Sequence, residues 1–89
     1  MRASSYTIQF ERDLRLMIRR NKDIDKIKTV IASLIDGEDL PERYRDHILV
    51  GIYKGRRECH IQADLLLVYK LTEDEIIFER TGTHADLFR

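Results

Sequence analysis

The chain has 89 residues, of which 43% are hydrophobic and 36% are charged, and its formal net charge at pH 7 is zero. This length allows one core and one domain over residues 1–89, and this composition excludes an intrinsically disordered chain. The single cysteine, Cys59, excludes an intramolecular disulfide, and the apolar run at 65–68 is far too short to cross a bilayer. We therefore expect a cytoplasmic protein without a membrane association.

The first part of the chain predicts a short strand followed by two amphipathic helices. Residues 6–10 alternate and are rich in β-forming side chains, which favours a strand. Apolar residues at helical spacing predict a first helix of about three turns that ends near Asn21. These residues are Phe10, Leu14, Met17 and Ile18. A second, stronger stripe follows, with Asp23 as a candidate N-cap and Gly37 just past the end. Its members are Ile24, Ile27, Val30, Ile31, Leu34 and Ile35.

The second half of the chain predicts strands. A loop at 36–46, which holds the only proline, precedes strand candidates at 48–53, 58–62, 65–71 and 76–80. Within the second candidate Cys59 alternates inward, which places His60 on the wetter face. The predicted order is β-α-α-β-β-β-β. We expect an α+β fold in which two N-terminal helices pack on a small antiparallel sheet.

Basic residues are concentrated in two segments despite the neutral total. Residues 12–28 carry seven basic and three acidic side chains, and residues 43–57 carry five and one. Basic patches can therefore form on this neutral protein and bind nucleic acid. Solvated helix faces explain the same charges equally well.

Side chains in the last third are suited to metal-free RNA cleavage. In that reaction the 2′-hydroxyl attacks phosphorus, so the protein supplies a base, an acid for the leaving 5′-oxygen and a cation for the phosphate. Histidine can give or take a proton near neutral pH, and the arginine fork matches phosphate oxygens. The candidates are His60, Asp64, Arg80 and His84. Each also has a structural explanation, such as a turn position for Asp64 or a cross-strand ion pair for Arg80.

Other kinds of site are less well supported. Positions 47, 60, 64 and 84 match none of the usual spacings of zinc ligands, and no glycine-rich phosphate-binding loop is present. We therefore expect no metal and no cofactor, and we expect Cys59 to be a buried structural thiol. The residues alone indicate a small α+β domain with a candidate phosphate or RNA site.

Four segments together resemble YafQ-type toxins of the RelE/ParE superfamily. They span residues 40–47, 51–60, 64–70 and 80–88, and the resemblance covers nearly the whole chain. It implies a RelE-like fold and a toxin of a bacterial type II toxin-antitoxin pair. It further implies a ribosome-dependent endoribonuclease that cleaves mRNA in the A site.

The resemblance also implies roles for single residues. The implied catalytic set is His47, His60, Asp64, Arg80 and His84. Among them His84 is the general acid and Arg80 stabilises the phosphate, while the base is left open among His47, His60 and Asp64. The implied substrate-binding residues are Lys54, Arg57 and Phe88.

One position departs from the family pattern. Family members often have tryptophan after the aspartate, whereas Leu65 follows Asp64 here. We expect this change to remove a stacking surface for a base, which Tyr53 or Phe88 would then supply.

The resemblance implies partners as well: a cognate antitoxin protein that blocks or distorts the site, the ribosome and mRNA, and operator DNA bound indirectly through the antitoxin. The two basic segments would then face ribosomal RNA. Two other functions stay open, a ParE-like toxin that poisons DNA gyrase and a non-catalytic RNA-binding module. The histidine-rich ending disfavours the gyrase poison.

Overall fold

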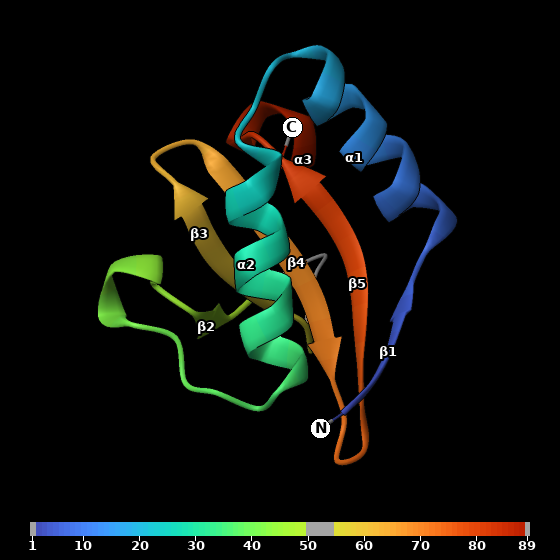
Figure 1. Cartoon of the computed structure of the whole chain (residues 1–89), viewed down its shortest axis with the longest axis vertical. Helices are drawn as coiled ribbons and strands as arrows, with labels where there is room; N and C mark the ends of the chain where they lie inside the picture. Colours follow the sequence, from blue (N-terminus) through green and yellow to red (C-terminus); the bar gives the residue numbers. More distant parts are fainter. Residues whose placement is uncertain (1, 50–54, 89) are drawn as a thin grey trace.

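The computed structural model describes residues 2–49 and 55–88, in which two helices pack on one face of a five-stranded sheet (Figure 1). The elements are β1 (Ala3–Tyr6), α1 (Ile8–Arg19), α2 (Ile24–Ile35), the 3₁₀ turn η1 (Glu42–Tyr44), β2 (His47–Ile48), β3 (Arg57–Gln62), β4 (Leu65–Leu71), β5 (Glu75–Gly82) and α3 (His84–Leu87). The α+β class and the β-α-α-β-β-β-β order are confirmed, with η1 and α3 as additions.

The sheet has the strand order β1-β5-β4-β3-β2. Strands β2 to β5 form an antiparallel meander, but β1 pairs with β5 in parallel. The sheet is therefore antiparallel as expected, except at the β1 edge. The helices carry the chain from one edge of the sheet to the other, and the four-strand meander then brings β5 back beside β1 in the same direction.

The prediction of a strand at residues 6–10 is wrong, because this stretch contains the last residue of β1 and the first turn of α1. Thr7 is the N-cap of α1, and its hydroxyl accepts a hydrogen bond from the Phe10 backbone N–H at 3.0 Å. Such a cap satisfies one of the free N–H groups of a helix start. This local bond, together with the packing of the helix, outweighs a short β-like alternation.

The other helix boundaries agree with the prediction. Asn21 follows α1 with a φ of 56°, and Gly37 follows α2 with a φ of 77°, the left-handed conformation expected past a helix end. The Asp23 carboxylate caps α2 by accepting a hydrogen bond from the Lys26 backbone N–H at 3.1 Å.

The main core lies between the two helices and one face of the sheet. Its fully buried members come from α1, α2, β3, β4 and β5, and Cys59 is among them as predicted. The stripe expected on α1 is only partly right. Ile18 is 52% exposed, whereas Asp13 is buried at 7% exposure. The reason is an ion pair of Asp13 with β5, described below.

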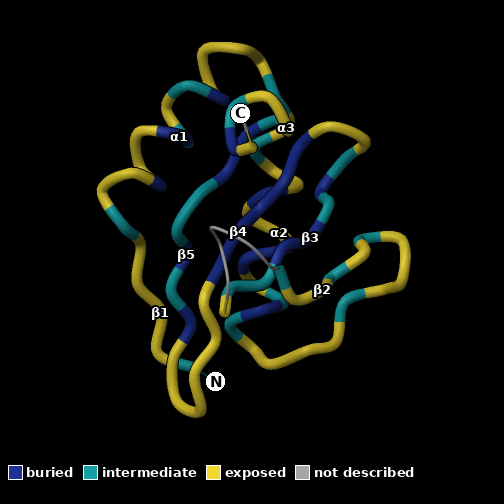
Figure 2. The backbone as a smooth tube through the Cα atoms, turned by 180° about the vertical axis from the view of Figure 1, so that it is seen from behind, coloured by how far each residue is buried: buried dark blue, intermediate teal, exposed yellow. Residues whose placement is uncertain are grey.

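The other face of the sheet carries a smaller apolar cluster of Leu66, Val68 and Leu87, with Leu49 packed against it. Figure 2 shows this face from behind, with β4 buried along most of its length and α3 near its upper end. Among the described residues, no helix has the length and apolar character needed to span a membrane. The strand expected at 48–53 is described only up to residue 49, so Tyr53 and the neighbouring Lys54 lie outside the described residues.

Candidate active site

The three histidines lie side by side although they come from three different elements. His47 belongs to β2, His60 to β3, and His84 is the first residue of α3. The ring centroids of His47 and His60 are 6.2 Å apart, and those of His60 and His84 are 5.7 Å apart. His60 is the cross-strand partner of Leu66, so His60 lies on the sheet face that carries the smaller apolar cluster. We call the three residues the histidine cluster.

A buried carboxylate, Glu58, lies under the histidine cluster. It is 4% exposed, and its Oε1 is 3.0 Å from His60 Nε2 and 3.9 Å from His47 Nε2. Glu58 therefore lies within ion-pair distance of His60 Nε2, and His60 Nδ1 takes no part in this contact. Sequence reasoning missed Glu58 as a functional residue. The available signal was its position two residues before His60, which places both side chains on one face of β3.

His47 is oriented by the loop that precedes it. Its Nδ1 lies 2.6 Å from the backbone carbonyl oxygen of Arg45. A carbonyl oxygen only accepts hydrogen bonds, so Nδ1 donates and the Nε2 atom faces Glu58.

Asp64 orients His84. One carboxylate oxygen, Oδ1, accepts hydrogen bonds from the His84 backbone N–H at 3.0 Å and from its Nδ1 at 2.9 Å. The backbone bond first, and the ring bond second, lower the pKa of the Asp64 carboxyl below its usual 3.8. The ionised aspartate therefore holds a proton on His84 Nδ1 and leaves Nε2 open for proton transfer.

Phe88 stands next to His84 at the end of α3. The two ring centroids are 6.1 Å apart, and the Phe88 backbone N–H donates to the His84 carbonyl oxygen at 2.8 Å. Phe88 is 36% exposed, so part of its ring is accessible beside the imidazole.

The short helix α3 is fixed by contacts at its first turn. Thr83 and Asp86 form a capping box, and the Asp86 carboxylate also accepts from the Arg20 guanidinium at the end of α1, at 2.8 Å. A Cβ atom on the buried Gly82 would lie 3.0 Å from the Asp86 carboxylate, so the residue before the cap must be small. The position of His84 thus depends on β5 and α1 together.

Arg80 is held by α1. Its Nε lies 2.7 Å from Asp13 Oδ2 and its Nη2 lies 3.3 Å from Asp13 Oδ1, a bidentate ion pair. Asp13 Oδ2 also accepts from the Thr81 backbone N–H at 3.1 Å. Sequence reasoning missed this partner, because a lone acid inside an apolar stripe gave no sign that the fold buries it.

Arg57, expected to contact RNA, and Leu65, the position that departs from the family pattern, both lie away from the histidine cluster. Arg57 lies on the side of β3 opposite to His60, and its Nε donates to Asp46 at 3.1 Å. Leu65 is 1% exposed in the main core and therefore offers no stacking surface to a base. The first residue of β4 faces the helices, and the preceding turn, where Asp64 sits, reaches the other side.

One group of side chains has the donor atoms for a metal ion. Glu58, His60 and His84 each place one ligand atom within 4.8 Å of the others. Imidazole and carboxylate donors suit zinc and related divalent ions. The histidine spacing did not indicate this group, since one member is a carboxylate and another comes from a distant helix.

Comparisons with known proteins identify the family. The family model for the bacterial toxin of the type II toxin-antitoxin system, YafQ, matches residues 2–89. The mRNA interferase toxin YafQ of Escherichia coli K12 is 45% identical over 84 residues, which cover 93% of this chain and 91% of that protein.

Solved structures agree. The DinJ-YafQ toxin-antitoxin complex of E. coli matches with a TM-score of 0.93 and 44% identity, over 99% of this chain and 98% of that one. A metal-bound toxin from Helicobacter pylori matches with a TM-score of 0.90 and 33% identity, over 99% and 100% of the two chains. The predicted resemblance is confirmed, and the chain belongs to the YafQ family of bacterial type II toxin-antitoxin toxins.

Proposed function

We propose that this chain arrests growth by cleaving mRNA in the ribosomal A site, through general acid–base catalysis by the histidine cluster and Asp64. The observation that carries the proposal is the juxtaposition of three imidazoles, two of which lie 3.0 and 2.9 Å from a carboxylate oxygen. Three titratable rings in contact provide both a proton acceptor and a proton donor for phosphoryl transfer. Its relative in E. coli, named an mRNA interferase toxin, supports RNA as the substrate.

His84 is the general acid in this proposal. Its Nδ1 proton is engaged by Asp64, so a proton on Nε2 is the one that passes to the leaving 5′-oxygen as the P–O5′ bond breaks. Asp64 is thereby a positioning residue for the acid.

The base removes the proton from the 2′-hydroxyl as its oxygen forms the new bond to phosphorus. His60 is best placed, because Glu58 fixes its Nε2 at 3.0 Å and leaves Nδ1 to take the proton. This arrangement repeats the logic of an imidazole base that is oriented by a carboxylate. Arg80, held by Asp13, is the proposed cation for the charge that develops on the phosphate.

Phe88 is the proposed stacking surface, since its partly exposed ring adjoins His84. Leu65 cannot serve this purpose from the core. Leucine in place of the family's tryptophan at position 65 therefore mainly affects core packing, and Phe88 positions the RNA nucleobase.

A cognate antitoxin is the proposed protein partner, as in the DinJ-YafQ complex of E. coli. It would block the histidine cluster or distort it, and it would bring the toxin indirectly to operator DNA. Induced expression tests this function: the wild-type chain stops growth, and co-expression of the antitoxin from the same operon restores it. Arrest with intact mRNA and damaged DNA would instead favour a gyrase poison.

A further inference from the structure

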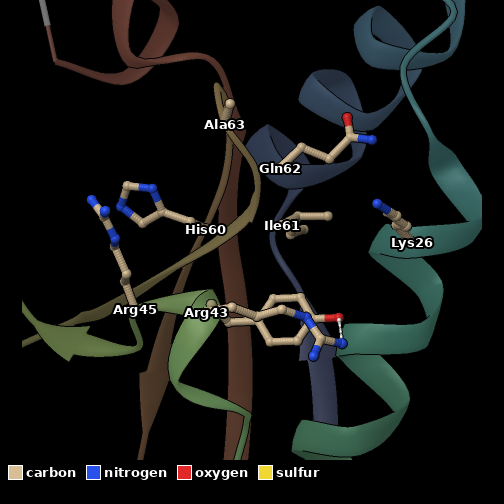
Figure 3. Close-up of a pocket in the computed structure, with 8 residues that line it drawn as sticks. Lys26, Arg43, Arg45, His60, Ile61, Gln62 and Ala63 are labelled. Carbon is tan, nitrogen blue, oxygen red and sulfur yellow. Dashed lines mark hydrogen bonds between the residues drawn. The ribbon is translucent and has the colours of Figure 1, made fainter.

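A cavity of about 490 Å³ adjoins the histidine cluster on the side of α2 (Figure 3). Its walls are η1 with the following residue, the end of β3, and Lys26 of α2. We call it the basic cavity. Among the described residues, β2 pairs only with Arg57 and Glu58 of β3, so the outer edge of β3 has no strand neighbour beyond that point. The cavity occupies this open edge.

Three cations line the basic cavity: Lys26, Arg43 and Arg45. All three are exposed, no acidic residue lines the cavity, and within residues 2–49 and 55–88 none of the three forms an ion pair. Elsewhere the described arginines are often paired, as Arg80 is with Asp13. Unpaired cations around a concave surface attract an anion.

The basic cavity also has a flat apolar wall. Tyr44 is half-buried, and its ring lies 4.9 Å from the Arg43 guanidinium carbon, which stacks over it. Ile61 is 4% exposed and closes the inner side. An aromatic ring, an arginine plane and phosphate-binding cations together suit a nucleotide, and the volume lies in the range of small-ligand sites.

Arg45 connects the basic cavity to the histidine cluster. Its backbone is left-handed, with φ 48° and ψ 45°, an unfavourable conformation for a residue with a large side chain. In this conformation its carbonyl oxygen accepts the His47 Nδ1 hydrogen bond while its side chain lines the cavity. Figure 3 shows the Arg45 and His60 side chains next to each other at one end.

We propose that the basic cavity is the subsite for the mRNA nucleotide next to the scissile phosphate. Arg43, Arg45 and Lys26 bind its phosphate oxygens, and the base lies against Tyr44 and Ile61. This inference rests on the proposed RNA-cleaving function, because His60 lines the cavity and also belongs to the catalytic set. When the scissile phosphate of an RNA strand lies among the histidines, the neighbouring nucleotide lies in the basic cavity.

The test is an NMR titration of the full, isotope-labelled chain with an RNA trinucleotide that 2′-O-methylation makes uncleavable. The backbone amides of residues 43–45 and 60–63 should shift and saturate together. The double variant Arg43→Gln/Arg45→Asn should bind at least about tenfold more weakly, since each lost phosphate contact weakens binding. Asparagine is chosen because it tolerates the left-handed backbone at position 45.

The matched control is Arg12→Gln/Arg15→Gln, which removes the same charge from exposed positions of α1. It should bind the trinucleotide within about twofold of the wild type, because distant exposed charges are screened by salt. Equal weakening of both double variants, or shifts that map away from the basic cavity, would overturn the inference.

A ribosome sedimentation assay distinguishes mRNA from ribosomal RNA as the ligand. The variant Arg43→Gln/Arg45→Asn should still sediment with ribosomes. If it loses ribosome association but keeps trinucleotide affinity, the cations serve ribosomal RNA and the inference fails. A different result would overturn the proposed RNA-cleaving function: the wild-type chain would bind the trinucleotide in the basic cavity but would not cleave mRNA.

Discussion

Each histidine of the cluster has a separate partner that fixes one of its ring nitrogens. Glu58 engages His60 at Nε2, Asp64 engages His84 at Nδ1, and the Arg45 carbonyl engages His47 at Nδ1. The remaining nitrogens stay available for proton transfer. Pre-arranged partners of this kind reduce the reorganisation that a reaction requires.

The buried Glu58 should matter for rate rather than for substrate binding. We expect Glu58→Gln to lower kcat by about 100-fold with little change in KM, since general base catalysis contributes roughly that factor or more. The amide keeps the side-chain volume but loses the carboxylate that orients His60. Single-turnover cleavage on programmed ribosomes measures the effect, with the exposed Glu73→Gln as the control. A variant with unchanged kcat would remove Glu58 from the mechanism.

The Asp64–His84 contact should depend on pH in a defined direction. The hydrogen bonds from His84 place the pKa of Asp64 below its usual 3.8 in the folded state. The stabilisation is therefore fully present above the unfolded-state pKa and is lost as the pH falls through the folded-state pKa. NMR titration of the carboxyl carbon should show a midpoint below 3.8, and the His84 amide should shift with it. A midpoint at or above the usual value would contradict the contact.

Among the secondary-structure elements, α1 helps to position both β5 and α3. Asp13 holds Arg80 on β5, and Arg20 holds Asp86 on α3. Because α3 is a single turn, it depends on this support and on its capping box. The first helix therefore helps to build the site although none of its residues belongs to the histidine cluster.

Removing the Asp13 carboxylate should destabilise the link between α1 and β5. We expect Asp13→Ala to lower the free energy of unfolding by about 3 kcal/mol, because it removes the buried carboxylate that accepts hydrogen bonds from the Arg80 guanidinium and from the Thr81 N–H. Asp13→Asn keeps an acceptor oxygen and should cost less. Denaturant unfolding measures both, with the exposed Asp25→Ala as the control. An Asp13→Ala chain as stable as that control would show that the ion pair contributes nothing.

In the whole molecule, one face of the sheet carries the main core and the other carries the proposed catalytic histidines. The face under α1 and α2 carries the main core, and the other carries the small apolar cluster and His60. The pairing of β2 with β3 brings His47 to His60, and α3, which follows β5, brings His84 to the same place.

The sequence predicts the elements with a strong local signal and misses those set by tertiary contacts. The apolar stripe of α2 and its cap at Asp23 were sufficient to predict this helix, because its core packing and its local hydrogen bonds both favour the same conformation. The parallel pairing of β1 depends on the path of the whole chain, which no local pattern encodes. The same holds within the site. The histidines were found by residue type, and the position of Glu58 two residues before His60 was a signal for it, whereas Asp13 becomes recognisable only once the fold buries it beside Arg80.

The proposed cleavage of mRNA by His84 is tested most directly by primer extension on a defined message. The message is incubated with the purified wild-type chain or with His84→Gln, each in the presence and absence of translating ribosomes. We expect cuts within A-site codons that require ribosomes and fall by at least about 100-fold in the variant, since glutamine cannot donate the acid proton. The variant should keep the wild-type melting temperature, because the His84 side chain is 54% exposed. Equal cleavage by the folded variant, or no cleavage by the wild type on ribosomes, would contradict this proposal.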